Sequence, residues 1–238
     1  MQNNEPCNIE GDVLLIDKPM DWTSFDVVCK IRNTLSKYAQ VKRIKVGHSG
    51  TLDPLATGLL IVCIGKKTKT IDTLQGLDKC YEGSMILGAT TPSFDKETEI
   101  NATFSLEDIN KTKIIHTIKQ FSGKIIQKPP IFSAVKIDGE AAYKKARKGE
   151  EVKVREREVE IYDFQITKID LPEVYFKVHC SKGTYIRSLV DDFGKALNNG
   201  AHLSSLRRLS IGDFSLKNAL QLDEFLKQFQ IEKESESI

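Results

Sequence analysis

Short apolar runs recur along the chain and predict the strands of a sheet. Leu59 to Ile64 is a continuous apolar run of strand length, and apolar residues alternate with polar ones at Val174, Phe176 and Val178. Both patterns are typical of strands. On these grounds strands are expected at residues 13–16, 59–64, 81–90, 131–137, 151–169 and 173–180.

Other segments repeat their apolar residues at helical spacing. Ser24 is expected to cap a helix that runs to about Tyr38, with Val28, Ile31, Leu35 and Tyr38 on one face. Four more helices are predicted: from Ser105 to Phe121, from Glu140 to Lys148, from Thr184 through Phe193, and over roughly residues 220–230. Strands far apart in the sequence, with helices between them, predict an α+β fold around a mixed or antiparallel sheet.

The composition is that of a globular chain with a sizeable core. Of 238 residues, 40% are hydrophobic and 29% are charged. The net charge is only +2, so any binding of a polyanion has to come from local clusters. No run approaches the roughly 18 apolar residues of a membrane helix, and the opening MQNNEPCNIEGD does not read as a signal peptide. We therefore expect a cytoplasmic protein whose residues 1–10 are a flexible segment.

The cysteines and histidines are too scattered to build a metal site. The five cysteines are odd in number and contain no C-x-x-C pair, and the histidines contain no H-E-x-x-H. Neither a disulfide framework nor a structural zinc site is expected. No metal is implied.

The most unusual segment is GHSGTLDPLATG, residues 47–58, with the lone carboxylate Asp53 in its middle. Its glycines permit sharp turns, so no regular structure is expected there. Such a loop next to a buried strand is where a rigid catalytic carboxylate would be placed. The plainer alternative is that Asp53 only caps a turn. The spacing fits neither a phosphate-binding P-loop nor a serine triad.

A second candidate segment, CSKGTYIR, joins a predicted strand to a predicted helix. The backbone N–H groups of a helix start suit an anion. Tyr185 and Arg187 would reach into one cleft, unless Tyr185 packs in the core and Arg187 is a solvated helix charge.

Basic residues are grouped in four runs, which would form a phosphate-binding surface if they shared a face. Nucleic acid is therefore the expected partner. The runs are Lys42, Arg43 and Lys45; Lys66, Lys67 and Lys69; Lys144, Lys145, Arg147 and Lys148; and Arg207 with Arg208.

Four separated motifs together resemble the TruB family of tRNA pseudouridine-55 synthases. They are LLIDKP, GHSGTLDPLATGLL, CSKGTYIRSLVDDFG and AHLSSLRRL, in this order between about Gly11 and Leu209. The resemblance implies the pseudouridine synthase fold, a mixed and largely antiparallel central sheet flanked by helices. It also implies a catalytic domain over residues 11–212 and a short helical extension over residues 213–238.

The resemblance implies a reaction as well. A uridine in the T-loop of tRNA is isomerised to pseudouridine: the N-glycosidic bond breaks, the uracil turns, and a C–C bond forms to the same sugar carbon. No metal or organic cofactor is used. The catalytic aspartate falls on Asp53, which would either attack the sugar carbon or remove a sugar proton. The uracil has to be flipped out of its loop first.

The substrate-binding residues of the family are carried over motif by motif. Arg187 is expected to pair with Asp53 and keep it ionised, Tyr81 to stack on the uracil, and Lys18 to support the catalytic loop. The full set is His48, Tyr81, Tyr185, Arg187, Leu206 and Lys18.

Two features depart from the family pattern. Only about 30 residues follow Leu209, so no RNA-binding domain of the PUA kind is expected. The segment TTPSFDKETEI, residues 90–100, keeps Thr91 and Asp95 of a T-x-T-x-D-x-x-G pattern but has no glycine at its end, which leaves the role of that loop open.

Three rival functions stay open beside the enzyme. One is a non-catalytic chaperone that binds and folds tRNA, the second a relative that modifies ribosomal RNA within a guide-RNA particle, and the third a small-molecule hydrolase that uses Asp53 alone. The expected protein is a monomer that binds the T-arm of tRNA, with no guide RNA and no membrane.

Overall fold

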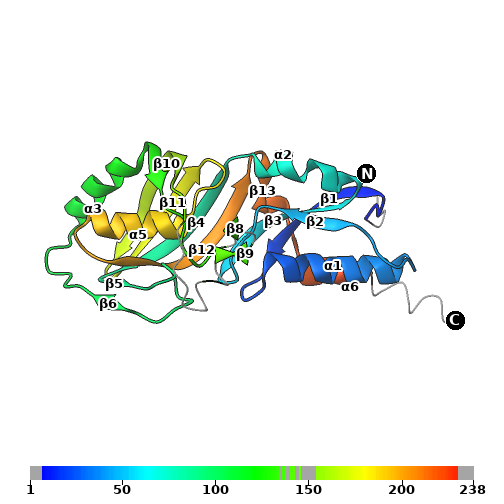
Figure 1. Ribbon diagram of the computed structural model, residues 1–238, viewed down its shortest axis with the longest axis horizontal. Helices are drawn as coiled ribbons and strands as arrows, with labels where there is room; N and C mark the ends of the chain where they lie inside the picture. Colours follow the sequence, from blue (N-terminus) through cyan, green and yellow to red (C-terminus); the bar gives the residue numbers. More distant parts are fainter. Residues whose placement is uncertain (1–6, 134–135, 138–139, 143–144, 146–153, 230–238) are drawn as a thin grey trace. The chain divides into compact units, whose positions relative to one another are not determined.

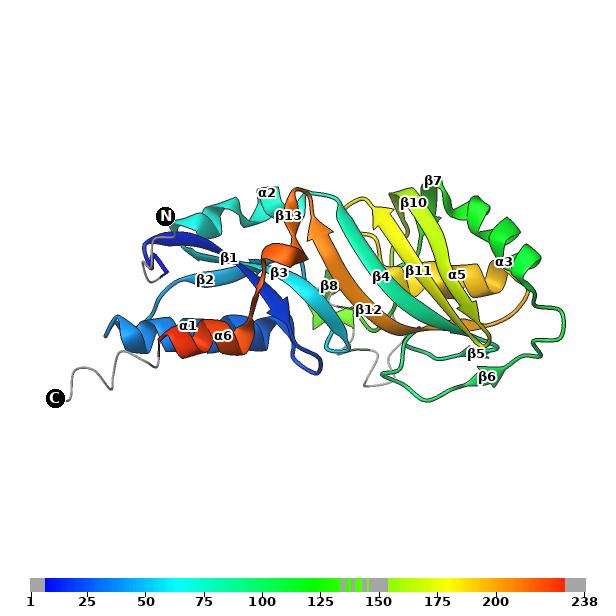
Figure 2. The ribbon, with the colours of Figure 1, turned by 180° about the vertical axis from the view of Figure 1, so that it is seen from behind.

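The computed structural model describes residues 7–133, 136–137, 140–142, 145 and 154–229. The chain divides into two compact units, one made of residues up to Lys79 and from Arg207 onwards, the other of residues 80–206. Figures 1 and 2 show the elements from opposite sides. Helices pack against β-sheet in both units, and the sheet is mixed and largely antiparallel, so the predicted fold class is confirmed.

Among the described residues the first unit contains three α-helices, two short 3-10 helices and most of the early strands. Its elements are β1 (Gly11–Lys18), α1 (Ser24–Tyr38), β2 (Val46–Ser49), β3 (Ala56–Gly65), η1 (Lys66–Thr70), α2 (Ile71–Gln75), the end of β12 (Ala201–Ile211), β13 (Phe214–Ser215), η3 (Leu216–Asn218), β14 (Leu220–Gln221) and α6 (Leu222–Gln228). The strand order is β14-β1-β3-β12, and β2 also pairs with β3. β14 runs parallel to β1, whereas β1 and β2 are both antiparallel to β3.

Strand β3 has a hydrophobic core on each of its faces. Leu60 and Val62 belong to the cluster formed with α1 and α6, while Leu59 and Ile61 belong to a smaller cluster against α2. Side chains alternate between the two faces of a strand. The continuous apolar run is therefore explained by burial on both sides, with α1 and α6 side by side on one face and α2 on the other (Figures 1 and 2).

The second unit is a largely antiparallel sheet with helices on one face. Its elements are the rest of β4 (Lys79–Leu87), β5 (Ala89–Thr90), β6 (Ala102–Thr103), α3 (Lys111–Ile118), η2 (Lys119–Phe121), β7 (Gly123–Gln127), β8 (Lys136–Ile137), β9 (Glu140–Ala141), β10 (Arg157–Asp170), β11 (Glu173–Cys180), α5 (Ile186–Ala196) and the start of β12. The strand order is β12-β4-β11-β10-β7, with β5–β6 and β8–β9 as separate pairs.

Aromatic side chains join the helices of this unit to its sheet. The ring of Phe164 on β10 lies 5.7 Å from Phe176 on β11 and 6.2 Å from Phe193 on α5, centroid to centroid. Phe121 lies 5.8 Å from Phe193. Contacts at these distances add to the stabilisation that burial alone provides. They fix α5, the helix that carries Arg187, on the sheet.

Three helices begin elsewhere than predicted. Thr23, not Ser24, caps α1, because its hydroxyl accepts the amide of Asp26 while the Asp26 carboxylate accepts the amide of Thr23. Asn110, not Ser105, caps α3, and α5 begins at Ile186 with Tyr185 at its N-cap.

Several other expectations are also corrected. Tyr38, the last residue of the predicted apolar face of α1, is 37% exposed, and its ring packs edge-on against that of Phe229. Residues 131–133 are not strand, β8 covers only Lys136–Ile137, and the strand expected from residue 151 begins at Arg157. The predicted helix at Glu140–Lys148 starts instead with strand β9; its described residues Ala142 and Lys145 are helical, and the rest lies outside the described residues. No described helix is long and apolar enough to cross a membrane.

Candidate active site

Asp53 lies in a short loop, residues 50–55, between β2 and β3. The segment was expected to lack regular structure, but its first part is strand β2 and its last part opens β3. The amide of Ala56 donates to the carbonyl of Asp53 at 3.0 Å, which closes the turn at the start of β3. Asp53 itself is partly buried in this loop.

The residues on both sides of Asp53 are hydrogen-bonded to residues 18–24, the segment that leads into α1. The Ser24 hydroxyl accepts the amide of Leu52 at 2.8 Å and donates to its carbonyl at 3.1 Å. The carbonyl of Pro54 accepts the Asp21 amide at 3.0 Å and Lys18 Nζ at 3.3 Å. The backbone on each side of the carboxylate is therefore fixed by long-range hydrogen bonds.

Lys18 is completely buried and holds three carbonyl oxygens. Its Nζ donates to Pro19 at 2.9 Å, to Trp22 at 2.5 Å and to Pro54 at 3.3 Å. Burial lowers the pKa of Lys18 to about 8, and the negative charge of Asp53 opposes that shift. The attraction is mutual, so a charged Lys18 stabilises the ionised carboxylate of Asp53. Its contacts are those of a residue that supports the loop.

His48 lies on β2 opposite Val62, just before the loop. Burial lowers its pKa, the positive charge of Arg208 lowers it further, and a hydrogen bond with the Gly50 backbone works against both. The ring is therefore neutral at pH 7. Its Nδ1 atom is buried and has no hydrogen-bond partner among the residues that the structure describes.

The fourth basic run makes hydrogen bonds and an ion pair within the first unit. Arg208 is 1% exposed and donates from Nε to the Leu59 carbonyl at 2.7 Å and from a terminal nitrogen to the Gly50 carbonyl at 3.0 Å. Arg207 forms a two-point ion pair with Asp17 at 2.6 and 3.2 Å. The expectation of a phosphate contact is wrong for Arg208, which is buried, whereas it stays a prediction for Arg207, whose side chain is 37% exposed beside Asp17.

Gly58 explains why Arg208 approaches this closely. Its φ is +100°, and a Cβ atom there would lie 2.4 Å from the carbonyl oxygen of Arg208. Only glycine tolerates both conditions.

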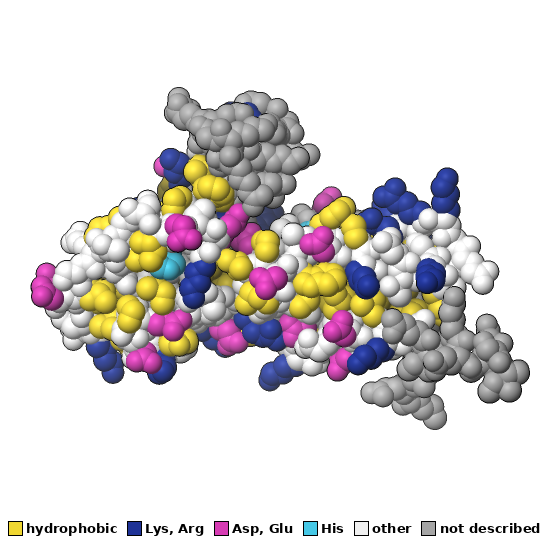
Figure 3. Space-filling model, turned by 90° about the horizontal axis from the view of Figure 1, so that it is seen from below, with side chains coloured by type: hydrophobic (Ala, Val, Ile, Leu, Met, Phe, Trp, Pro, Cys, Tyr) yellow, Lys and Arg dark blue, Asp and Glu magenta, His cyan; other side chains and the backbone are white. Residues whose placement is uncertain are grey.

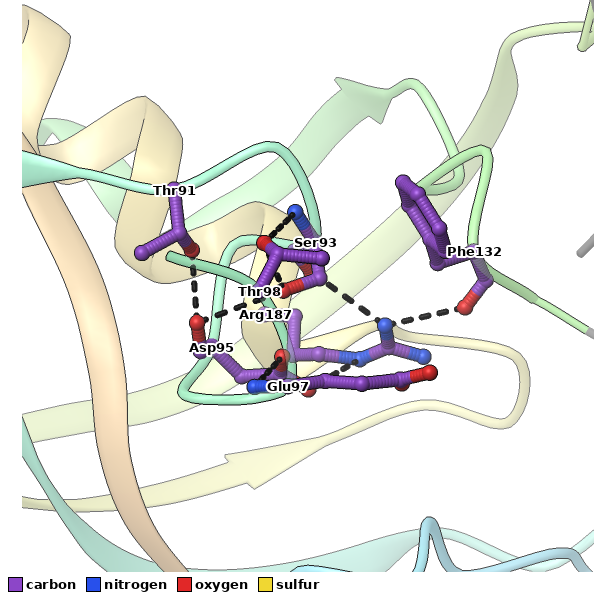
Figure 4. Close-up of polar contacts among 7 residues, drawn as sticks. All are labelled: Thr91, Ser93, Asp95, Glu97, Thr98, Phe132 and Arg187. Carbon is purple, nitrogen blue, oxygen red and sulfur yellow. Dashed lines mark hydrogen bonds and ion pairs between the residues drawn. The ribbon is translucent and has the colours of Figure 1, made fainter. Parts of the chain in front are cut away.

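In the second unit, Arg187 is 3% exposed and is held by the 90–100 loop (Figure 4). Its Nε lies 3.6 Å from the carboxylate of Asp95. One terminal nitrogen donates to the carbonyls of Ser93 at 3.2 Å and Phe132 at 2.9 Å. Arg187 is thus not a solvated helix charge. Its predicted pairing with Asp53 stays a prediction.

The 90–100 loop keeps its shape without the glycine of the family pattern. Thr91 donates from its hydroxyl to the carbonyl of Asp95 at 2.6 Å, and the amide of Glu97 donates to the Asp95 carboxylate at 2.9 Å. The Ser93 and Thr98 hydroxyls lie 2.8 Å apart (Figure 4). The loop that sequence reasoning left without a role is the one that orients Arg187.

The three remaining predicted residues also lie in the second unit. Tyr185 occupies the N-cap position of α5. Its backbone amide donates to the Gln127 side chain at 2.7 Å, and its carbonyl accepts from the same side chain at 3.0 Å. The Arg157 guanidinium lies 4.7 Å from the centroid of the Tyr185 ring. Tyr81 on β4 is 8% exposed, and Leu206 on the neighbouring strand β12 is also 8% exposed.

The structure therefore groups the predicted residues by unit. Asp53, Lys18 and His48 belong to the first unit, and the other four belong to the second. Ser24 and Asp95 were not predicted as site residues. The sequence carried a signal only for Asp95, because it stands in a recognisable motif; a lone serine at a helix start carries none. Among the described residues no three His, Cys, Asp or Glu side chains gather as a metal site would require.

Comparison with known protein families gives two matches that together run to the end of the chain. Residues 36–186 match the family model "TruB family pseudouridylate synthase (N terminal domain)". Residues 187–238 match "tRNA pseudouridylate synthase B C-terminal domain".

Curated relatives are similar over nearly the whole chain. The tRNA pseudouridine synthase B of Flavobacterium johnsoniae is 55% identical over 223 residues, which cover 93% of this chain and 97% of that protein. The one of Phocaeicola vulgatus is 49% identical over 227 residues, with 94% and 97% covered.

Solved structures show the same fold in larger chains. A chain in the "Crystal Structure of a Cbf5-Nop10-Gar1 Complex" has a TM-score of 0.72 and 32% identity, covering 97% of this chain and 57% of that one. A chain in a structure titled as an H/ACA RNP bound to a substrate RNA containing 2'-deoxyuridine has a TM-score of 0.68 and 29% identity, covering 96% and 56%. The chain thus spans little more than half of these neighbours.

Proposed function

The chain belongs to the TruB family of pseudouridylate synthases, and from that premise we propose that it is an enzyme that isomerises a uridine of tRNA to pseudouridine. The observation that carries the proposal is the Asp53 loop, a lone carboxylate whose two neighbouring residues are clamped by Ser24, Asp21 and Lys18. Relatives that are about half identical over nearly their full length carry this activity in their names. We further propose that the target is uridine 55 in the T-loop.

The reaction is an isomerisation, because the same uracil returns to the same sugar carbon; its C5 loses a proton to solvent when the new bond forms, and N1 gains one. The N-glycosidic bond breaks, the ring turns, and a C–C bond forms. In the proposed mechanism Asp53 either attacks that carbon or removes a sugar proton, and both roles need the ionised carboxylate. Lys18 supplies a buried positive charge that favours this form while holding the Pro54 carbonyl. His48, neutral and next to the loop, supports the extruded base.

The second unit would receive the flipped uracil. Extrusion costs a few kcal/mol, and stacking on the ring of Tyr81 would return about 1–3 kcal/mol. Leu206 and Tyr185 line the pocket in this proposal. Asp95 and the carbonyls of Ser93 and Phe132 orient Arg187, and in this proposal its guanidinium would face the reacting centre. Holding groups in place before the reaction is the main way in which such a site lowers the barrier.

We propose in addition that the enzyme acts in the cytoplasm as a monomer and without a guide RNA. The support is the contrast between the two groups of relatives. Chains of nearly equal length are named as a single tRNA enzyme, whereas the chains solved within complexes are longer and only about 30% identical.

The test is pseudouridine formation by Asp53→Asn on tRNA that carries tritium at C5 of its uridines. The wild-type chain is expected to release tritium without added guide RNA. Asp53→Asn should release none above background, because an amide neither attacks the sugar nor accepts its proton, while tRNA binding changes less than about threefold. Asp213→Asn, the same chemical change at an exposed position of the same unit, should behave as wild type. Normal turnover by Asp53→Asn would reject the mechanism, and an inactive wild type that still binds tRNA would indicate a chaperone instead.

A further inference from the structure

We propose that a basic hollow in the first unit binds phosphates of the tRNA well away from the loop that carries the target uridine. This inference rests on the proposed function. The basic hollow is the depression between the start of β2 and η1 that is lined by Arg43, Lys45, Lys66 and Lys69. Its cations come from two of the four basic runs of the sequence, the one at residues 42–45 and the one at residues 66–69.

Backbone hydrogen bonds fix the spacing of these cations. The amide of Gly65 donates to the carbonyl of Lys45 at 2.8 Å, and the amide of Lys66 donates to the carbonyl of Glu10 at 2.7 Å. Gly65 has a φ of +54°, and a Cβ atom there would lie 2.2 Å from the Glu10 carbonyl oxygen. The close approach of these segments therefore requires glycine, and it holds the two runs together as part of the fold.

The basic hollow is a strong local concentration of charge in a nearly neutral chain. Glu10 is the one acid among its lining residues, and its pair with Lys66 is long, 3.7 Å, and fully open to water. Such an exposed ion pair contributes little to stability, so Lys66 is available to bind another anion. An adjoining hollow shares Arg43 and Lys45 and adds Arg32, which donates to the Val46 carbonyl at 3.2 Å. Figure 3 shows Lys and Arg side chains without acidic ones between them at the right-hand end of one face, which belongs to this unit.

The chemistry favours a polyphosphate backbone over a membrane surface. The apolar lining residues Ile9 and Ile44 pack against the core, Ile44 with 6% exposure and Ile9 partly buried, so the cations are not accompanied by exposed apolar side chains of the kind that insert into lipid. Five cations arranged along two adjoining hollows match a row of phosphates better than one small anion.

The position of the basic hollow favours a large substrate. β3 runs ten residues from the end of the Asp53 loop to Gly65. At about 3.3 Å per residue the two sites lie about 30 Å apart along this strand. That distance is comparable to the full length of a short RNA hairpin, whereas a complete folded tRNA extends well beyond it.

The experiment compares two substrates with one variant. Arg43→Gln, Lys45→Gln, Lys66→Gln and Lys69→Gln are combined in the full chain; all four side chains are exposed, so the fold should be kept. For full-length tRNA the KM is expected to rise about tenfold and the kcat to stay unchanged, because counterion release is lost. The slope of log Kd against log salt should become shallower by about 3, at 0.7–0.9 per phosphate contact. For a hairpin of the T-arm alone, kcat/KM should change less than about twofold.

The matched control is Lys217→Gln with Lys227→Gln, two exposed lysines elsewhere in the same unit, which should leave both substrates unaffected. Unchanged KM and salt slope for full-length tRNA in the fourfold variant would overturn the proposal. An equal loss on the hairpin would also overturn it, since that points to folding or catalysis. Loss of binding to phosphatidylserine vesicles with intact tRNA affinity would assign the hollow to a membrane and reject the RNA. If the wild type makes no pseudouridine on either substrate, the proposed function fails, and the tRNA-binding comparison alone then decides about the hollow.

Discussion

At the scale of single residues, the candidate site depends on buried cations that bind carbonyl oxygens. Lys18 binds the Pro54 carbonyl beside Asp53, Arg208 binds the Gly50 carbonyl at the start of the loop, and Arg187 binds those of Ser93 and Phe132. Hydrogen bonds to charged donors are the stronger kind, and losing one inside a protein is costly. The loops that carry the chemistry are therefore held by side chains from distant elements.

The pKa of Lys18, lowered to about 8, predicts an alkaline limb in the pH profile. Above pH 8 the neutral amine of Lys18 has only two N–H donors for its three carbonyl partners and holds the Asp53 loop less firmly, so kcat/KM should fall with an apparent pKa of about 8. Initial rates between pH 6 and 10 test this. Lys18→Met should be less active and should lack the limb. A wild-type rate that stays flat to pH 10 would contradict the assigned role.

The same shift has the opposite consequence for stability. Unfolded Lys18 keeps its proton up to its ordinary pKa of 10.5, whereas the folded state releases it at about 8. Between these values the unfolded state binds more protons, so this residue's contribution to the free energy of unfolding rises with pH. Activity and the Lys18 contribution to stability should therefore move in opposite directions above pH 8.

A second prediction at this scale concerns Asp95. Asp95→Asn removes the buried carboxylate that faces Arg187 but keeps its size and its acceptor for the Glu97 amide. Breaking a buried ion pair in this way should cost about 3 kcal/mol in the free energy of unfolding. We expect kcat to fall at least about tenfold because the guanidinium is no longer oriented. Asp170→Asn, at an exposed pair with Lys168, is the control and should change neither quantity noticeably. Wild-type kcat in Asp95→Asn would show that Asp95 is not needed to position Arg187.

At the scale of elements, the start of α1 both begins a helix and braces the catalytic loop. Thr23 forms the capping box with Asp26, and this leaves the Ser24 hydroxyl available for the backbone of Leu52. The two adjacent residues thus have separate tasks, one within the helix and one across to the loop.

Replacing each of these two residues separates the tasks. Ser24→Ala leaves the buried amide of Leu52 without its acceptor, which should cost about 1–3 kcal/mol and lower kcat because the backbone before Asp53 is released. Thr23→Ala should cost about 1 kcal/mol through the lost cap and leave kcat unchanged. Thermal unfolding and tritium release on both variants check this. Equal kcat for the two variants would mean that the Ser24 contact does not act on the loop.

At the scale of the whole molecule, the charge is nearly balanced but unevenly distributed. The net charge of +2 gives no hint of a nucleic-acid partner, yet two basic runs meet at one hollow of the first unit. Arg207 and Arg208, which look equally basic in the sequence, are occupied by Asp17 and by backbone carbonyls. Composition is thus a poor guide here, and the arrangement of the charges is informative.

A further prediction at this scale follows from the residue types that the site uses. Because the proposed chemistry needs only Asp53 and its supporting side chains, pseudouridine formation on a T-arm hairpin should continue in EDTA with monovalent salt alone. The hairpin is used because full-length tRNA needs divalent ions to fold. Rates within about twofold with and without EDTA are expected. A loss of activity that added zinc or magnesium restores would disprove metal-free catalysis.

The sequence by itself determined the parts that follow from local pattern. The apolar run of β3 and the alternation of β11 depend on residues close together in the chain, and both strands were located correctly from them, whereas strand β2 within the Asp53 motif was not expected. Only the tertiary structure decided that Thr23 rather than Ser24 caps α1, that Arg208 is buried, and that the 90–100 loop holds Arg187. The physical reason is that periodicity reports which face of an element is apolar. The partner of a polar side chain depends instead on which distant segment packs opposite it.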